Sequence, residues 1–553
     1  MTEIPLSVPY VDVVVVGAGF TGLYALHKFR DEMKMSVRVF EAGGDVGGTW
    51  YWNRYPGCRC DVESIFYSYS FDEALQQEWS WSEKYASQPE ILRYLNHVAD
   101  RFDLRKGITF DTRVTALHWD DQESLWTVRT DDGNSLRCRY VISGVGTLSV
   151  AKKPEFGGIE NFQGEVLFTG NWPHETVDFS GQRVAVIGTG ASASQAIPLI
   201  AEEAAELLVF QRTPNFATPL ANAPIDAEQM RKIKEDYPSL REAARKGFIG
   251  VPYDQWLPSA LAVDPDERRR VYDDRYAAGG FRLFVDSFQD ILYNYDANET
   301  LAEYLRERIY ERVKDPDTAE RLVPKGYAYG TKRPLLETDY FETFNRENVR
   351  LIDVSEESID EITATGVRVG EHTYEVDVIV LATGFDAMTG PILAMDLRGR
   401  NGIRLADKWA DGPRTHLGLM VNQFPNLFMI TGPQSPSVLQ NMPMGIEDHV
   451  DFACDAINYL HSRDLNIIEP TEQAESMWLA LVNAIADLTL MPQSKSWYVG
   501  ANIPGKPRAC FLYLGGAPTY RQTCAEAVAG GYTGFYLSKA QAFDSKAVVG
   551  EAV

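Results

Sequence analysis

The sequence predicts an α/β protein built from two strand–turn–helix–strand units, with a mainly helical segment inserted after the second. Three observations lead to this fold class. Glycine-rich turns, GAGFTG at 17–22 and GTGASA at 188–193, each follow a short β-branched run and precede a helical pattern. The stretch 226–330 carries charged, helix-periodic runs separated by Gly and Pro. A chain of 553 residues is too long for one hydrophobic core, so several domains are expected.

The composition is that of an ordinary globular protein, with 45% hydrophobic and 24% charged residues. A formal net charge of −25 argues against general binding to nucleic acid or to anionic membranes. The N-terminus lacks a signal-like run, and no segment approaches the ~20 apolar residues that span a bilayer. These features predict a cytoplasmic protein. The six cysteines suggest no disulfide framework, and the eight histidines suggest no metal site.

The first unit begins with VDVVVV at 11–16, whose β-branched residues predict a buried parallel strand. The glycines of the turn that follows let the backbone approach a pyrophosphate, whose charge is favoured at a helix N-terminus. The next strand, VRVF, ends at Glu41, which is spaced to accept hydrogen bonds from a ribose diol. A lone GxGxxG motif is weak evidence for a dinucleotide site. In this order of elements, however, it predicts a dinucleotide site rather than a structural turn.

The second unit repeats this order with the strand RVAVI, the turn at 188–193, the helix SQAIPLIAEEA and the strand LLVF. Here Arg212 stands where the first unit has Glu41. An acidic residue would repel a 2′-phosphate, whereas an arginine pairs with one through a fork of hydrogen bonds. The second unit is therefore predicted to bind NADPH rather than NADH. The alternative is that Arg212 is an ordinary surface charge.

An aromatic, glycine-rich loop, GGTWYWNRYPGCRCD at 47–61, follows the first unit. Small residues next to aromatic ones suit a flat ring packed against backbone. The alternative is an aromatic core beneath the loop, and for Trp52 and Tyr55 the two readings are equally open. Two dinucleotide units and this loop indicate that two dinucleotides meet. We interpret the chain as a flavoprotein that takes hydride from a nicotinamide and reacts with oxygen.

Several motifs in order carry a family resemblance. The stretch from Gly48 to Asp61 matches the pattern [A/G]GxWxxxx[F/Y]P[G/M]xxxD. The two glycine fingerprints, QRTP at 211–214, KRP at 332–334, ATGFD at 382–386 and SWYVGANIPGKP at 496–507 accompany it. With these motifs the chain resembles the type I Baeyer–Villiger monooxygenases, which are class B flavoprotein monooxygenases, over nearly its whole length. Cyclohexanone, cyclopentanone and steroid monooxygenases all look similar to it.

The resemblance implies tightly bound FAD, NADPH and O2 as reactants, and the conversion of cyclic or aryl ketones to lactones or esters. Oxidation of sulfides is a further activity that it allows. The catalytic residues it implies are Arg333, as the positive charge that stabilises a flavin C4a-peroxide, and Asp61, which orients that arginine. The alternative for Arg333 is a second phosphate ligand beside Lys332.

The resemblance also assigns the remaining site residues. Arg212, Thr213 and Lys332 would hold the 2′-phosphate, and Trp497 would contact the nicotinamide half. The implied cofactor-binding residues are Gly17, Gly19, Phe20, Thr21, Gly22, Glu41, Gly48, Thr49, Trp50, Arg59, Asp61, Tyr67, Val114, Gly188, Thr189, Gly190, Ala191, Ser192, Arg212, Thr213, Lys332, Arg333 and Trp497. The implied substrate residues are Ser437, Val438, Leu439 and Met442, which could equally be ordinary core.

The expected architecture is thus α/β, with two Rossmann-like dinucleotide-binding domains, for FAD and NADPH, and a helical insertion. The FAD-binding domain is predicted at 1–145 and 385–553, the NADPH-binding domain at 146–225 and 331–384, and the insertion at 226–330. We expect a monomer or a weak homo-oligomer whose partners are a small ketone and O2.

One position departs from the family pattern FxGxxxHxxxW[P/D]. Phe168 takes the place of the histidine, between Gly164 and Trp172. The phenylalanine side chain has no hydrogen-bonding group, so any polar contact that the family histidine makes is lost here. We expect the chemistry to persist with altered coupling between the nucleotide domains. Two alternatives stay open, a flavin-containing or N-hydroxylating monooxygenase and an uncoupled NADPH oxidase. Trp172, Asp61 and Arg333 together favour the Baeyer–Villiger reading.

Overall fold

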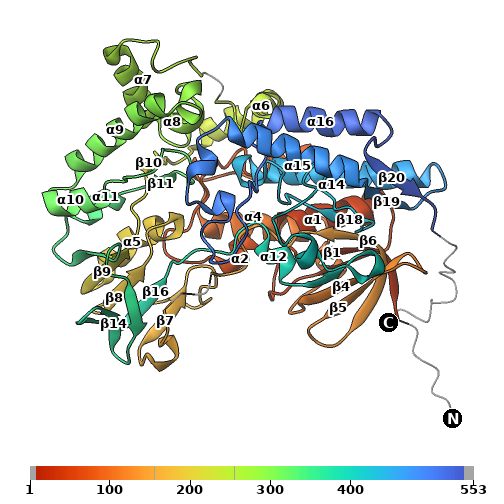
Figure 1. The fold of residues 1–553 in the computed structure, drawn as a ribbon, viewed down its shortest axis with the longest axis horizontal. Helices are drawn as coiled ribbons and strands as arrows, with labels where there is room; N and C mark the ends of the chain where they lie inside the picture. Colours follow the sequence, from red (N-terminus) through yellow and green to blue (C-terminus); the bar gives the residue numbers. More distant parts are fainter. Residues whose placement is uncertain (1–7, 153, 155, 254–255, 541–553) are drawn as a thin grey trace.

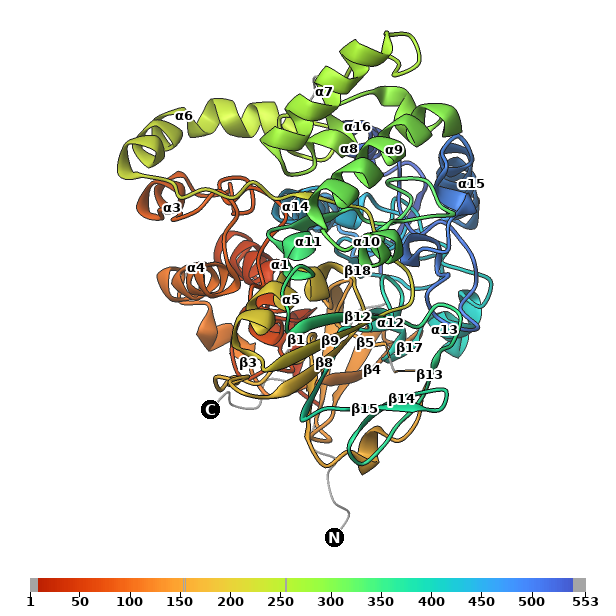
Figure 2. The ribbon, with the colours of Figure 1, turned by 90° about the vertical axis from the view of Figure 1, so that its left-hand side faces the viewer.

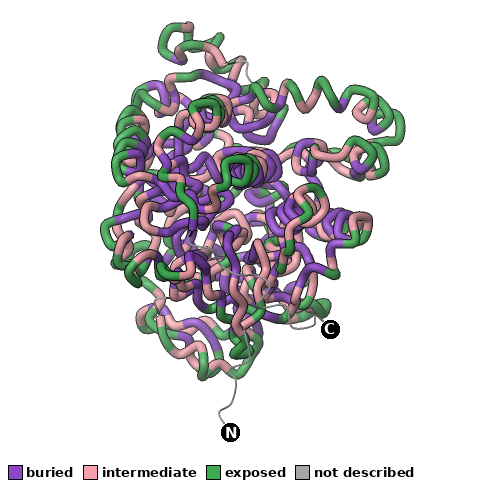
Figure 3. Tube along the Cα trace, turned by 90° about the vertical axis from the view of Figure 1, so that its right-hand side faces the viewer, coloured by how far each residue is buried: buried purple, intermediate pink, exposed green. Residues whose placement is uncertain are grey.

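The computed structural model describes residues 8–152, 154, 156–253 and 256–540. Two separate sheets form its base, and helices cover them (Figure 1). The buried residues gather at the centre of the molecule, whereas the outer turns of the helical segment are exposed (Figure 3). Within the described ranges, no helix combines the length and the apolar character that a membrane span needs.

The first sheet has the strand order β17-β4-β5-β6-β1-β2-β3. Its parallel centre pairs β1 with β2 on one side and with β6 on the other, so that Val16 lies between Phe40 and Ser143. Its strands are β1 (Tyr10–Val16), β2 (Val37–Phe40), β3 (Ile108–Thr109), β4 (Val114–Asp120), β5 (Leu125–Thr130), β6 (Ser135–Ser143), β17 (Asp396–Arg398) and β18 (Leu427–Met429), which pairs with the end of β6.

Helices from both ends of the chain cover this sheet. The predicted first helix forms as α1, which continues as a π-helical turn over His27–Glu32. These helices are α1 (Phe20–Leu26), α2 (Thr49–Trp52), α3 (Glu73–Glu78), α4 (Gln88–Arg101), α12 (Gly390–Leu393), α13 (Leu405–Lys408), α14 (Met442–His461), α15 (Glu472–Asp487) and α16 (Ala517–Ala529). A short antiparallel pair, β19 (Ile467–Pro470) and β20 (Phe535–Ser538), joins the helices of the C-terminal part.

The second sheet is parallel throughout, in the order β12-β9-β8-β16-β7. Its predicted unit forms as β8 (Arg183–Ile187), α5 (Ala191–Glu203) and β9 (Glu206–Gln211). The other strands are β7 (Glu165–Phe168), β12 (Val349–Asp353) and β16 (Val378–Leu381), and an antiparallel meander adds β13 (Ile359–Ile362), β14 (Gly366–Val369) and β15 (His372–Glu375). Its core strand β16 is fully buried, as its apolar run predicts.

The helical segment forms a lobe above the two sheets (Figure 2). It contains α6 (Ala227–Lys246), α7 (Pro265–Ala278), α8 (Arg282–Val285), α9 (Tyr295–Arg312) and α10 (Pro316–Leu322). At its base β10 (Ala217–Pro219) pairs with β11 (Leu335–Glu337), and α11 (Tyr340–Thr343) leads back to the second sheet. Arg241 of α6 donates to Ser68 Oγ at 2.7 Å, which ties the lobe to the first sheet's domain.

The loop 47–61 joins the two units directly. The Tyr55 hydroxyl donates to Gln195 Oε1 of α5 at 3.0 Å. The Trp172 amide donates to the Trp52 carbonyl at 3.1 Å. A Cβ on Gly57 would lie 2.3 Å from the Gln195 carbonyl oxygen, so only glycine fits where the loop meets α5. The site between the units is therefore held by short-range contacts from both.

Gly22 allows α1 to pack closely on the turn that precedes it. A Cβ on Gly22 would lie 1.9 Å from the Gly17 carbonyl oxygen. We expect Gly22→Ala to destabilise the fold by about 1–3 kcal/mol through this overlap, measured as a lower unfolding midpoint temperature. Gly157→Ala is the control, because a Cβ there meets nothing within 4 Å. Equal midpoints for the two variants would contradict this packing argument.

Candidate functional site

The first glycine turn presents backbone rather than side chains at the start of α1. Gly17 has a φ of 99°, and its amide donates to the Phe40 carbonyl at 2.8 Å. A Cβ on Gly48 would lie 3.0 Å from the Gly19 Cα, so the aromatic loop begins in direct contact with the turn. Glu41 is buried and accepts from the amides of Ala18 at 2.7 Å and Gly43 at 2.8 Å. Burial raises the pKa of Glu41, against the effect of these hydrogen bonds.

The two helices that follow the glycine turns lack capping side chains. The N-cap residues are Gly19 for α1 and Gly190 for α5, and neither makes a side-chain hydrogen bond. By contrast, α3, α6, α7, α9, α10 and α15 begin at Asp, Asn or Thr side chains that accept from backbone amides. A Cβ on Gly190 would meet nothing within 4 Å. Free amides at an open helix N-terminus fit the phosphates of a dinucleotide.

The aromatic loop packs as a cluster beside the first turn. Trp50 is buried, and its indole nitrogen donates to the Tyr67 hydroxyl at 3.2 Å. The Tyr67 ring meets the Phe20 ring edge-on at 5.3 Å. Tyr55 is also buried and faces α5, which agrees with the core alternative for that residue. The predicted flavin residues Trp50, Tyr67 and Phe20 thus lie together.

Two other predicted residues have different surroundings. Arg59 donates to Glu83 at 2.9 Å and to the Tyr85 carbonyl at 3.3 Å, so its charge is compensated inside the protein. Val114 is buried at the start of β4. The sequence pattern did not distinguish Arg59 from an ordinary surface residue, or Val114 from an ordinary core residue.

Arg333 and Asp61, which are 272 positions apart in the chain, form an ion pair. Arg333 donates to Asp61 Oδ2 from Nε at 3.2 Å and from Nη2 at 3.0 Å. Its Nη1 donates to the Val438 carbonyl at 3.1 Å, and its guanidinium lies 5.0 Å from the centre of the Phe281 ring. The Arg333 side chain is 25% exposed. Burial lowers its pKa, but Asp61, Tyr498 and Cys60 together outweigh this, and the pKa of Arg333 is raised above its ordinary value.

Two further cations gather near the second glycine turn. The Lys332 ammonium lies 4.1 Å from the centre of the Tyr327 ring. Burial, and then the nearby charge of Arg212, lower the pKa of Lys332. Across the described residues neither cation forms a salt bridge. The Thr213 carbonyl accepts from the Thr189 hydroxyl at 3.3 Å, which joins this strand end to the glycine turn. Two uncompensated cations beside a phosphate-binding turn fit an additional phosphate group.

The segment 494–507 brings three of the sequence motifs together. Ser494 Oγ donates to the Thr331 carbonyl at 3.1 Å, beside the KRP motif. Asn502 Nδ2 donates to the Phe385 carbonyl at 3.0 Å, and Lys506 Nζ donates to the Ala387 carbonyl at 2.7 Å, beside the ATGFD motif. The Trp497 ring is partly buried against Tyr498, with 4.4 Å between ring centres. These contacts hold the segment beside the KRP motif, where Tyr498, the residue after Trp497, neighbours Arg333.

Tyr498 is a site residue that the sequence pattern did not single out. Its side chain is buried, and its hydroxyl is one of the buried polar atoms without a hydrogen-bond partner within the described residues. Burial raises the pKa of Tyr498 to about 12, although the neighbouring Arg333 acts in the opposite direction. The hydroxyl therefore stays protonated beside Arg333. Its position next to Trp497 in the SWYVGANIPGKP motif was the available signal.

The loop 431–439 holds the carbonyl that Arg333 contacts. Thr431, Gln434 and Ser437 adopt left-handed φ values of 54°, 69° and 46°. Ser437 is buried, and its hydroxyl donates to the Thr431 carbonyl at 3.0 Å. The Thr431 amide donates to His449 Nδ1 of α14 at 2.8 Å. Backbone strain of this kind is characteristic of functional sites.

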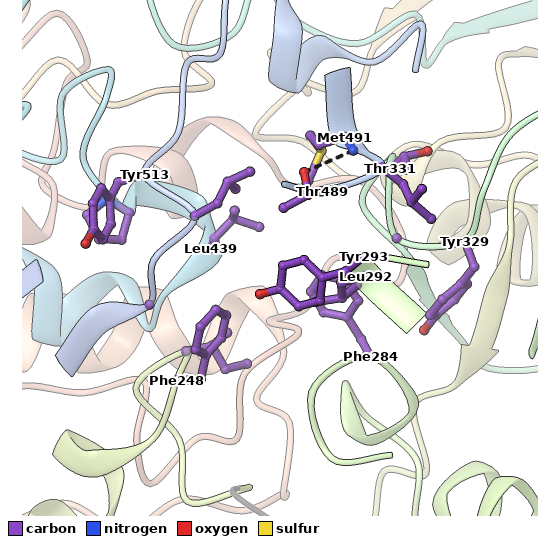
Figure 4. Close-up of a pocket in the computed structure, with 16 residues that line it drawn as sticks. Phe248, Phe284, Leu292, Tyr293, Tyr329, Thr331, Leu439, Thr489, Met491 and Tyr513 are labelled. Carbon is purple, nitrogen blue, oxygen red and sulfur yellow. Dashed lines mark hydrogen bonds between the residues drawn. The ribbon is translucent and has the colours of Figure 1, made fainter. Parts of the chain in front are cut away.

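The predicted substrate residues differ in what they face. Leu439 lines a cavity of about 40 Å³, the Val438 carbonyl accepts from Arg333, the Ser437 hydroxyl donates to the Thr431 carbonyl, and Met442 begins α14. Figure 4 shows the cavity between side chains from distant parts of the chain. Its walls include Phe248, Phe284, Tyr293, Tyr329, Met491 and Tyr513. The sequence pattern did not identify these residues, because they come from six separate segments.

Phe168 lies at the end of β7, the edge strand of the second sheet. A Cβ on Gly170 would lie 2.6 Å from the Phe385 ring and 3.0 Å from the Phe168 ring, so the two rings flank this glycine. The Phe385 carbonyl is the one that Asn502 contacts. Phe168 thus belongs to an apolar contact that reaches the segment 494–507.

The chain is similar to known flavin-dependent monooxygenases. A family model described as FMO-like, flavin-binding monooxygenase-like, matches residues 11–218. A Baeyer–Villiger monooxygenase of Pseudooceanicola batsensis is 42% identical over 94% of this chain and 95% of its own length. Cyclohexanone 1,2-monooxygenase of Acinetobacter sp is 40% identical over 93% of this chain and 94% of its own length.

Solved structures of flavin-dependent monooxygenases are also similar to this chain. An oxidised steroid monooxygenase bound to NADP has a TM-score of 0.92 and 48% identity, covering 96% of this chain and 100% of its own. A complex of OTEMO with FAD and NADP has a TM-score of 0.93 and 40% identity, with coverage of 96% and 100%. The predicted α/β fold with two dinucleotide-binding domains is confirmed. The chain therefore belongs to the Baeyer–Villiger monooxygenases.

Proposed function

We propose that Arg333, oriented by Asp61, is the catalytic centre of this FAD-containing, NADPH-dependent Baeyer–Villiger monooxygenase, which oxidises ketones to esters or lactones. The observation that carries this assignment is the Arg333–Asp61 pair itself, with N–O distances of 3.0 and 3.2 Å. The pair lies where the aromatic loop, the KRP motif, the loop 431–439 and the segment 494–507 come together.

When bound, FAD reduced by NADPH supplies the activation of O2 for insertion beside the ketone carbonyl. Arg333 keeps its positive charge, because its pKa is raised, and it stabilises negative charge that develops on oxygen atoms in the site. Asp61 fixes the direction of the guanidinium because its Oδ2 accepts from two N–H groups of Arg333. The Val438 carbonyl occupies a third N–H, so part of the fork remains for a substrate. Because the site is partly buried, less water screens the charge of Arg333, and its electrostatic interactions are stronger.

The two nucleotides would lie at the starts of α1 and α5, the helices that follow the two glycine turns. The turn at Gly17–Gly22 with Glu41 and the cluster of Trp50 and Tyr67 support FAD at α1. The turn at Gly188–Ala193 supports NADPH at α5. The unpaired charges of Arg212 and Lys332, with Thr213 beside them, are suited to the 2′-phosphate that distinguishes NADPH from NADH. Trp497, next to Tyr498 in the segment 494–507, would contact the nicotinamide half.

The substrate class, the location and the oligomeric state that the sequence predicts are also proposals. The substrates would be cyclic or aryl ketones, with sulfides as further ones, bound near Ser437, Val438, Leu439 and Met442. The net charge of −25 supports a small molecule, rather than nucleic acid or an anionic membrane, as the partner. A cytoplasmic location stays a prediction. A monomer or weak homo-oligomer stays a prediction. The domain limits at 145, 225, 330 and 384 stay predictions.

Replacing Arg333 tests the catalytic assignment. In Arg333→Ala, NADPH should still reduce the flavin, but ester or lactone formation should fall by about 10²–10³-fold or more, because the stabilising charge is lost. The measurement is product formed per NADPH consumed, with hydrogen peroxide followed in parallel. Arg350→Ala, at an arginine 56% exposed on β12, is the control. Undiminished product from Arg333→Ala would remove Arg333 from the catalytic role.

Arg212 is predicted to determine the choice of nicotinamide cofactor. Arg212→Glu should raise the KM for NADPH by about 10- to 100-fold, because a charge-assisted hydrogen bond to phosphate is worth ~1.5–3 kcal/mol. The KM for NADH should stay level or fall, since NADH has no 2′-phosphate to repel. Steady-state kinetics with both cofactors measures this, with Arg350→Glu as the charge-matched control. Equal losses with both cofactors would indicate a structural effect instead.

Phe168 is predicted to affect coupling rather than the chemical step. In Phe168→His, a polar group enters the apolar contact beside Phe385. We expect the same product, with a changed turnover rate and a changed ratio of hydrogen peroxide to ester. Phe162→His, at another partly buried phenylalanine of the same motif, is the control. If turnover and peroxide release both match the parent enzyme, Phe168 has no part in coupling.

A further inference from the structure

Arg333 is held from two sides that belong to different parts of the chain. Asp61, on the aromatic loop, accepts hydrogen bonds from two of its N–H groups. The Phe281 ring, which is buried and stands directly before α8 in the helical lobe, lies 5.0 Å from the guanidinium. The direction of Arg333 therefore depends on how firmly the lobe is joined to the aromatic loop.

A hydrogen bond joins the lobe to the chain just after Asp61. The hydroxyl of Tyr253, which lies between α6 and α7, donates to Glu63 Oε1 at 2.7 Å. Tyr253 is buried, and the Glu63 side chain is 13% exposed. The backbone of Glu63 is also fixed, because its carbonyl accepts from the amides of Phe66 at 2.9 Å and Tyr67 at 3.0 Å. The bond thus connects the lobe with the segment that carries Asp61 and Tyr67.

The same tyrosine supports the residues around Phe281. The Arg282 guanidinium lies 4.2 Å from the centre of the Tyr253 ring. On the other side of Phe281, Gly280 has a φ of 63°, and a Cβ there would lie 2.4 Å from the Tyr85 hydroxyl oxygen. Tyr253 and Tyr85 thus contact the residues on either side of Phe281, which leaves its ring little room to shift.

The bond between Tyr253 and Glu63 is of the strong kind, because its acceptor is a carboxylate. Burial, and then the charge of Glu63, raise the pKa of Tyr253 well above its ordinary value, so the hydroxyl keeps the proton that it donates. The Lys84 ammonium lies 3.5 Å from the same Glu63 oxygen. Glu63 therefore has two partners that hold its carboxylate in one direction.

We propose that Glu63 and Tyr253 are positioning residues for Arg333, because their hydrogen bond fixes the Phe281 ring relative to Asp61 and so fixes the guanidinium between them. The proposal rests on the proposed function, since it takes Arg333 as the catalytic charge. Stabilisation of developing negative charge depends on a donor that already points in the right direction. Breaking the bond should therefore slow ester formation, while reduction of the flavin by NADPH continues.

Tyr253→Phe tests the proposal, because it removes the hydroxyl and keeps the ring beside Arg282. The full-length, FAD-loaded enzyme is assayed with NADPH and a panel of cyclohexanone, cyclopentanone and acetophenone. The kcat for ester or lactone formation should fall about 10- to 100-fold. The KM values for ketone and NADPH, and the rate of flavin reduction measured by absorbance without oxygen, should stay within about twofold of the parent. The ratio of hydrogen peroxide to ester should rise.

Tyr304→Phe is the matched control. Tyr304 is another buried tyrosine of the lobe, its hydroxyl donates to Asp273 Oδ1 at 2.8 Å, and the Arg308 guanidinium lies 5.0 Å from the centre of its ring. These partners all belong to the lobe, so the bond does not reach the aromatic loop. Product formation in Tyr304→Phe should match the parent.

Substitutions of Glu63 test the same bond from its other end. Glu63→Gln keeps an oxygen that accepts from Tyr253, so it should retain more product formation than Glu63→Ala. This comparison stands by itself if Tyr253→Phe impairs folding. Combining Tyr253→Phe with Glu63→Ala should give a kcat no lower than that of the slower single variant, because both changes remove one interaction.

The outcomes separate this inference from the proposed function. A lower kcat with unchanged KM values and flavin reduction in Tyr253→Phe, and parent-like turnover in Tyr304→Phe, supports the inference. Equal turnover in the two tyrosine variants, equal losses of flavin reduction and product, or additive losses in the double variant would overturn it while leaving ketone oxidation by the parent intact. If the parent forms no ester or lactone from any ketone of the panel, the proposed function itself is wrong.

Discussion

The partly buried ion pair between Arg333 and Asp61 is the interaction on which the site depends. A guanidinium is planar and has five N–H donors, so one side chain can hold several partners in fixed directions. Here it joins Asp61 of the aromatic loop, the Val438 carbonyl and the Phe281 ring. These partners come from three separate parts of the chain. Removing either charge would leave the other partly buried without its partner, which is the costly case for an ion pair.

The positions of the two sheets explain why this pair can form. In open parallel sheets, ligands bind beyond the carboxyl ends of the strands, where the glycine turns lie. Both sheets present such an end, and contacts such as Tyr55 with Gln195 and Trp172 with Trp52 keep the two ends together. The helical lobe then closes a third side through Phe281 and Phe284. No single domain contains the whole site.

The sequence predicted the elements whose signals are local. Strand β1, the glycine turns and the helices of the 226–330 segment each follow from a short run of residues, and all of them form. The place of Glu41 at the end of β2 also follows from spacing. The Arg333–Asp61 pair could be predicted from the family motifs, although 272 positions separate the two residues. The cavity could not, because its walls come from segments between 248 and 516 whose apolar residues look like ordinary core. Tyr498 was missed because an aromatic residue in a loop gives no sign that its hydroxyl is buried.

The left-handed residues of the loop 431–439 impose a compromise on any effort to make the enzyme more robust. Thr431, Gln434 and Ser437 each adopt a conformation that costs about 1 kcal/mol or more for a residue with a side chain. Glycine would remove that cost, and a search for heat-resistant variants would select it. The buried side-chain contacts of Ser437 with Thr431 would go with it, and the carbonyl of Val438 would no longer be fixed in place. In this loop, a substitution that raises thermal stability would loosen the geometry of the active site. The natural residues keep that geometry at the expense of stability.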